Sequence, residues 1–137
     1  MKVFKVYDEV YRREFRLLIG TIDEACRHLK RLEWGDKRIR KFRKVSERAN
    51  GLCSVGECGG IAVWMPEFSG TPAEISVLAH ELMHAYMFVA KEFDLEVKGG
   101  TSHEMISYVE MLLRRFLEPL SRMLEEKRKT EADDEQK

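Results

Sequence analysis

The sequence is poor in cysteine, has no net charge and lacks a long apolar run, and each absence narrows the range of functions. Three cysteines fit a reducing compartment better than a disulfide scaffold. The 24 basic and 24 acidic side chains cancel, which argues against binding to nucleic acid through overall charge. No run is long and apolar enough to span a membrane, and the segment from Met1 to Asp8 lacks the apolar core of a signal peptide. We therefore expect a cytoplasmic protein with no membrane partner.

Hydrophobic residues are nevertheless plentiful, at 44% of the chain, which supports a sizeable core. The length of 137 residues suits one domain. After Leu124 the sequence is almost wholly charged and polar. We expect residues 1–122 to form a single domain and residues 123–137 to form a charged C-terminal tail that is disordered or a frayed helix.

The spacing of apolar residues predicts an α+β fold. Alternating patterns predict strands over residues 3–7 and 11–19, and an apolar run that Pro66 stops predicts a third strand over residues 61–65. Helical spacing predicts helices over residues 22–33 and 72–92, and over a third segment from 101 to about 118. A Thr-x-x-Glu capping box opens each of the first two helices. We expect a small antiparallel or mixed sheet of about three to four strands, packed on the 72–92 helix and two further helices.

The segment from residue 27 to residue 48 is basic, with ten lysines or arginines against three acids. A solvated helix face followed by a loop accounts for this charge. The alternative is a surface for an acidic partner, nucleic acid included. Only one aromatic residue, Phe42, lies in the densest part, so base stacking is poorly supported. His28 is expected to be a surface histidine without a role.

The clearest chemical motif lies within the expected 72–92 helix, where His80, Glu81 and His84 form a His-Glu-x-x-His pattern. Positions four apart share a helix face, so both imidazoles can bind one metal ion. Glu81, beside the first ligand, can reach a water molecule on that ion. Zinc in a hydrolytic site takes three protein ligands and keeps one open position. The motif therefore predicts two ligands and a base of a site for one Zn2+ ion, and a third ligand must come from elsewhere.

Glu104 is the expected third ligand of this metal site. It lies twenty positions after His84, and His103 lies nineteen after it, both at the start of the next expected helix. A connection of this length can bring that helix back across the first one, and both side chains are sensible zinc ligands. Asp94 is too close in sequence for an easy return. A simpler explanation of Glu104 is that it is the capping-box acid of residues 101–104.

These residues resemble the gluzincins, zinc peptidases whose third ligand is a Glu on a helix after the motif helix. The small size is similar to that of the single-domain minigluzincins, and the order of elements is similar to that of small zinc peptidases encoded by phages and prophages. The resemblance covers residues 20–32, 61–86 and 102–116, and its specific motifs lie in the last two stretches. One departure is Tyr108, which stands where thermolysin-like enzymes carry an acid that orients a motif histidine.

The resemblance implies a zinc-dependent metallopeptidase that hydrolyses peptide bonds in a peptide or protein substrate. Zn2+ would bind His80, His84 and Glu104 and lower the pKa of a water molecule to about 7. Glu81 would take the proton of that water as general base and pass it to the leaving amine.

Enzymes of this type usually add a His or Tyr donor that stabilises the developing oxyanion. Tyr108 is the first candidate for this catalytic role, followed by His103 and Tyr86. The substrate would lie as an added strand along residues 61–65, which we expect to be an edge of the sheet.

Two other interpretations remain open. The residues from His84 to Val89 also resemble the motif helix of SprT-like proteases, in which the third ligand is a histidine, here His103. That family places Gly directly beside this histidine, whereas Ser102 precedes it here. In that case the protein would be a DNA-associated protease that uses the basic 27–48 segment. The compact chain also suits a zinc-binding assembly or interaction protein that is catalytically weak or latent. The oligomeric state is not predicted.

Overall fold

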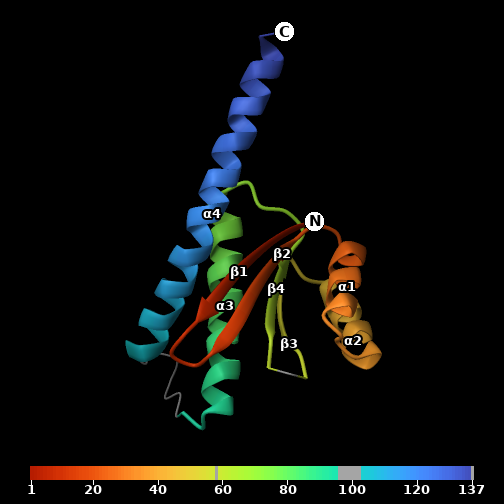
Figure 1. Cartoon of the computed structure of the whole chain (residues 1–137), viewed down its shortest axis with the longest axis vertical. Coiled ribbons are helices and arrows are strands. Elements are labelled where there is room, and N and C mark those ends of the chain that lie inside the picture. The colour runs from red at the N-terminus through yellow and green to blue at the C-terminus, as the bar shows by residue number, and fades with distance from the viewer. Residues whose placement is uncertain (58, 96–102, 137) are drawn as a thin grey trace.

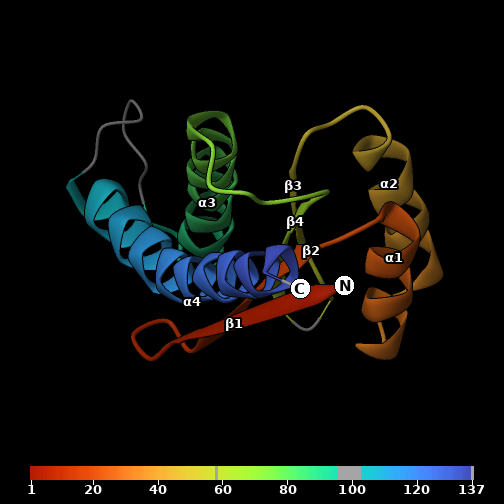
Figure 2. The same ribbon diagram turned by 90° about the horizontal axis from the view of Figure 1, so that it is seen from above.

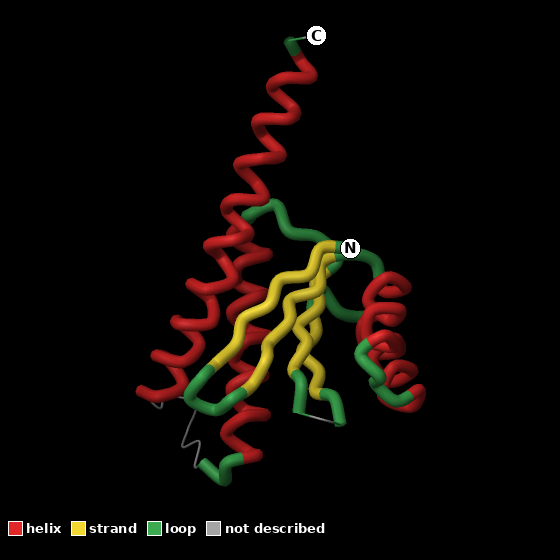
Figure 3. The backbone as a smooth tube through the Cα atoms, in the orientation of Figure 1, coloured by secondary structure: helices red, strands yellow, loops and turns green. Residues whose placement is uncertain are grey.

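A four-stranded mixed sheet forms the middle layer of the protein. The computed structural model describes residues 1–57, 59–95 and 103–136. The strands, drawn in yellow in Figure 3, are β1 (Lys2–Asp8), β2 (Arg13–Ile19), β3 (Leu52–Val55) and β4 (Ile61–Met65). Their order is β1-β2-β4-β3, with β2 and β4 parallel and the other two pairs antiparallel. The expected α+β fold with a mixed sheet is confirmed.

Helices cover both faces of this sheet, which gives three layers (Figures 1 and 2). On one face lie α1 (Ile22–Arg31) and α2 (Asp36–Ser46), and on the other lie α3 (Pro72–Glu92) and α4 (His103–Glu135). Alternation along β2 explains the two layers of core. Phe15 and Leu17 pack in the same hydrophobic cluster as residues of α3 and α4, whereas Leu18 packs with residues of α1 and α2.

Strand β4 lies inside the sheet and not at its edge. It pairs with β2 on one side and with β3 on the other, and all five of its residues are buried. This burial on both faces explains why residues 61–65 read as a continuous apolar run. The expectation that these residues form an edge strand for substrate is therefore wrong. The open edge on this side of the sheet belongs to β3.

The expected helix starts are confirmed for α1 and α3. Thr21 and Glu24 form a reciprocal capping box, and so do Thr71 and Glu74. Each box satisfies backbone N–H groups that have no partner within the first turn. Pro72 adds to the second start because its fixed φ suits the first helical position.

The basic segment contains a helix, α2, where the sequence predicts a helix face followed by a loop. Only two of its residues are buried, Phe42 and Ser46. The ring of Phe42 packs edge-on against Trp64 of β4, with ring centroids 6.2 Å apart. Because few apolar residues are spaced among many charged ones, the helical periodicity of this segment is weak, and the sequence alone does not predict this helix.

Helix α4 continues well past the expected end of the domain. It passes through Pro119 without ending and reaches Glu135. Its last buried residue is Leu120, and residues 125–136 are all exposed. Figure 1 shows this end of α4 extending beyond the other elements. The charged segment expected to be disordered or frayed is thus helical up to Glu135. No helix among the described residues has the length and apolarity needed to cross a membrane.

Gly51, just before β3, lets that strand approach α3 closely. A Cβ at this position would lie 2.6 Å from Cγ1 of Val77 and 3.3 Å from the carbonyl oxygen of Trp64. At Gly60, by contrast, a Cβ would meet nothing within 4 Å. Packing therefore leaves no room for a side chain at position 51, whereas position 60 has room for one.

We predict that Gly51→Ala lowers the free energy of unfolding by about 1–3 kcal/mol, because α3 and β3 must move apart. Gly60→Ala is the matched control and should change it by less than about 0.5 kcal/mol. Urea unfolding followed by circular dichroism measures both. Equal effects of the two substitutions would contradict the close approach at Gly51.

Candidate metal centre

The two motif histidines lie on the solvent-facing side of α3. Leu78, Leu82 and Ala85 of the same helix are buried against the sheet. His80 and His84 are exposed, as expected for positions that fall outside this apolar stripe. The helix thus holds both imidazoles on one open face while its other face anchors it to the core.

The imidazoles of His80 and His84 converge on one point. Their Nε2 atoms are 3.2 Å apart, and their ring centroids are 4.9 Å apart. Two nitrogens bound to one tetrahedral zinc at the usual Zn–N length would be roughly 3.3 Å apart. The pair therefore has the spacing that a shared zinc ion requires, and in this respect the residues fit the metal that the sequence predicts.

Glu81 lies beside this pair, on the side of α3 that faces β3. Its side chain is 8% exposed. Its Cγ would be 3.5 Å from a Cβ on Gly51, and burial, together with the charge of Glu81, raises the pKa of the Cys53 thiol. Among the described residues nothing forms a hydrogen bond with the Glu81 carboxylate. The carboxylate oxygens are not among the buried polar atoms without a partner in the described part of the chain, so they remain accessible, as a base that acts on water requires.

Glu104 is not brought to the histidines. It is exposed in the first turn of α4, and its charge is one of the causes, after burial, that raise the pKa of Tyr11. The ring of Tyr11 packs against Phe93, with centroids 5.1 Å apart. Phe93 follows His84 by nine residues, which is about 13 Å along the helix axis. Glu104 therefore lies toward the C-terminal end of α3.

Within residues 1–57, 59–95 and 103–136, no three His, Cys, Asp or Glu side chains lie close enough to hold a metal ion. The structure thus assembles two of the three expected ligands. His103, the alternative third ligand, is exposed at the first residue of α4. Cys58 and the first half of the expected 101–104 capping box lie outside the described residues.

Tyr108, the expected oxyanion donor, forms a hydrogen bond with Asp8 of β1. Its hydroxyl donates a hydrogen bond of 2.6 Å to Oδ2 of Asp8, and burial and this bond both raise its pKa. Its ring also packs against Tyr86, which follows His84 by two positions and so lies about 200° around α3 from it. The placement of Tyr108 and Tyr86 therefore does not favour a role at the metal.

Asp8 is the residue in this region that the sequence reading missed. It is the last residue of β1 and is 2% exposed. Besides Tyr108, it accepts hydrogen bonds from the backbone N–H groups of Val10 and Tyr11. The sequence signal was weak, because an Asp that ends a strand is normally read as a turn residue.

Two of the hollows that adjoin the exposed face of α3 lie near His84 and β3, and a third, of about 380 Å³, lies between Met83 and residues of α4. One of the first two, of about 470 Å³, is lined by His84, Lys91 and neighbouring residues of α3. The other, of about 220 Å³, runs along β3 and reaches Arg38 and Lys41 of α2. Phe88 lines both, so the two hollows are neighbours that meet at this side chain.

Comparison with models of protein families, with curated proteins and with solved structures gives no significant match. The functional argument therefore depends on the geometry of the chain itself.

We predict that Tyr108→Phe lowers the free energy of unfolding by about 1–3 kcal/mol, because the buried carboxylate of Asp8 loses its donor. Tyr7→Phe is the matched control, since Tyr7 is 52% exposed, and it should have almost no effect. Guanidinium unfolding of both variants provides the measurement. An unchanged stability of Tyr108→Phe would show that the bond to Asp8 is not formed in solution.

Proposed function

We propose that the protein is a zinc-dependent metallopeptidase in which His80 and His84 hold one zinc ion and Glu81 is the general base. The observation that carries this proposal is the 3.2 Å separation of the two Nε2 atoms on an exposed helix face. The carboxylate of Glu81, one residue from the first ligand and without a hydrogen-bond partner among the described residues, supports it. Both features are what hydrolysis at a zinc site requires of a chain.

When bound, zinc supplies Lewis acidity and lowers the pKa of a water molecule to about 7. Glu81 accepts a proton from water and delivers it to the amine that leaves. The side chain of Glu81 is only 8% exposed, which favours a fixed orientation of the base.

The proposed third ligand is Glu104, which the sequence spacing favours. Its exposed position near the end of α3 means that the first turn of α4 must move toward His84 for it to bind. His103 is the alternative at the same end of α4. Each proposal makes a distinct prediction for metal binding.

The proposed substrate is an extended peptide that adds to the open edge of β3, in place of the strand position expected from sequence. Strand addition uses the main-chain groups of an edge strand, and β3 pairs on one side only, with β4. The hollow along β3 adjoins the surface of His84 through Phe88. A peptide on β3 would thus pass close to Glu81.

A second candidate is a zinc-binding assembly or interaction protein with little turnover. The observation that favours it is that the described residues bring together only two ligands, while Tyr108 is bonded to Asp8. Tight zinc binding without cleavage of any peptide would support this candidate.

We also propose the cytoplasm as the compartment. Cys26 and Cys53 are buried free thiols, which a reducing environment preserves.

Metal analysis of the purified protein is the first test. We predict one zinc per chain in the wild type, and its loss in both His80→Ala and His84→Ala. Glu104→Ala should weaken zinc binding at least about tenfold, as expected on loss of one ligand. Glu118→Ala, an exposed acid on the same helix, is the control and should retain zinc. If Glu104→Ala and His103→Ala both bind zinc like the wild type, both third-ligand proposals are wrong.

Peptide cleavage is the second test. We predict that Glu81→Gln retains zinc but slows hydrolysis of an unfolded protein substrate by about 10² to 10⁴-fold, because the general base is lost. Glu118→Gln serves as control and should cleave at the wild-type rate. Undiminished cleavage by Glu81→Gln would refute the general-base role without affecting the proposed metal ligands.

A further inference from the structure

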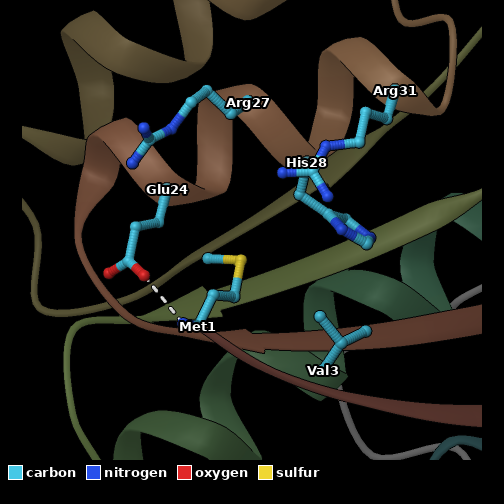
Figure 4. A pocket seen from close by; sticks show the side chains of 6 residues that line it. All are labelled: Met1, Val3, Glu24, Arg27, His28 and Arg31. Atoms are coloured by element: carbon cyan, nitrogen blue, oxygen red, sulfur yellow. Dashed lines mark hydrogen bonds and ion pairs between the residues drawn. The ribbon is translucent and has the colours of Figure 1, made fainter.

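A second concave site lies on the other face of the sheet from the histidine pair. It is a cavity of about 300 Å³ between α1 and the start of β1. Figure 4 shows the six side chains that line it, which are Met1, Val3, Glu24, Arg27, His28 and Arg31. Three of the six are basic side chains on consecutive turns of α1, so the cavity differs in chemistry from the apolar hollows elsewhere.

The one acid of this cavity is already paired. Glu24 accepts hydrogen bonds from the amine of Met1 at 2.7 Å and from the backbone N–H of Thr21 at 3.0 Å, and these bonds lower its pKa to about 2. Arg27 and Arg31 form no ion pair with other described residues. Their positive charges are therefore available to a ligand.

His28 points into this basic surrounding with an unsatisfied nitrogen. Its Nε2 is buried and has no hydrogen-bond partner among the described residues. Burial and then the charges of Arg16, Arg31 and Lys5 lower its pKa. Lys5 and Arg16 are direct cross-strand partners on β1 and β2, so they reach the same spot from the sheet while Arg31 reaches it from α1.

Two positive charges near the His28 ring, those of Lys5 and Arg31, form no ion pair with a described residue. The charge of Arg27, after that of Arg43, lowers the pKa of the Asp23 carboxyl, so Arg27 has an acid nearby. The charge of Arg16 is balanced by Glu14, with which it forms an ion pair. A buried polar nitrogen without a partner is unfavourable, and so is a cluster of like charges. An anion in the cavity would offset the cost of the like charges.

We propose that this cavity binds a phosphate group. A phosphate dianion matches the excess positive charge better than a carboxylate does, and its tetrahedral oxygens can accept hydrogen bonds from more than one of the lining side chains Arg27, His28 and Arg31. Arginine side chains recognise phosphate through two parallel N–H groups. The His28 ring also lines the cavity and can supply a further donor. This site is separate from the proposed metal centre, so its test does not depend on zinc.

Titration with inorganic phosphate at constant ionic strength tests the proposal. NMR signals of the His28 ring and of the α1 amides should shift and saturate, with a dissociation constant on the order of 1 mM or below. Arg31→Gln should weaken phosphate binding about tenfold, the effect of losing a charged hydrogen bond. Arg40→Gln on α2 is the control, because it removes the same charge from an exposed position outside the cavity and should leave the affinity unchanged.

The proposal is overturned if no saturable shift occurs, if acetate gives the same shift as phosphate, or if both arginine variants weaken binding equally. Arg31 is exposed, so its replacement leaves the core intact. His28→Gln provides a second variant, which should also weaken phosphate binding.

A parallel titration with a short single-stranded oligonucleotide identifies the source of the phosphate. If Arg31→Gln weakens oligonucleotide binding and Arg40→Gln does not, the cavity takes a phosphate of a nucleic-acid backbone. If both variants weaken it equally, the oligonucleotide binds the basic surface through charge alone, and the cavity serves a small phosphate compound.

Discussion

The parallel pairing of β2 with β4 is the constraint on which the rest of the structure depends. Parallel neighbours cannot be joined by a tight turn, so the chain between them must cross over the sheet. That connection contains α1, α2 and β3, and it covers one face. The next helix, α3, is left to cover the other face. The motif histidines and the basic cavity are on opposite sides of the sheet for this reason.

Three polar side chains are buried among the described residues, and they differ in whether they form hydrogen bonds with the protein. Asp8 accepts a hydrogen bond from the hydroxyl of Tyr108, and the hydroxyl of Ser46 donates one to the carbonyl oxygen of Phe42. These bonds offset the cost of burial. Glu81 has no such bond among the described residues. Its carboxylate oxygens remain accessible beside two converging imidazoles, so Glu81 differs from Asp8 and Ser46 in being available to a ligand or a water molecule.

Local features of the fold were predictable from sequence, and features set by distant contacts were not. The capping boxes at Thr21 and Thr71 and the His80–His84 pair each depend on residues within one or two turns of a helix. The interior place of β4 depends on which strands pair with it, and the bond between Tyr108 and Asp8 joins residues 100 positions apart. Spacing along the chain says little about such contacts.

The orientation of α4 decides which side chain can become the third ligand. Glu104 and Tyr108 are four residues apart and share that face, which the bond from Tyr108 to Asp8 turns toward β1. Turning Glu104 toward His84 therefore strains this bond, whose loss costs about 1.5–3 kcal/mol. Zinc binding in folded sites contributes about 10–16 kcal/mol, enough to offset that cost. His103 lies about 100° away around the helix, so the same movement does not apply to it.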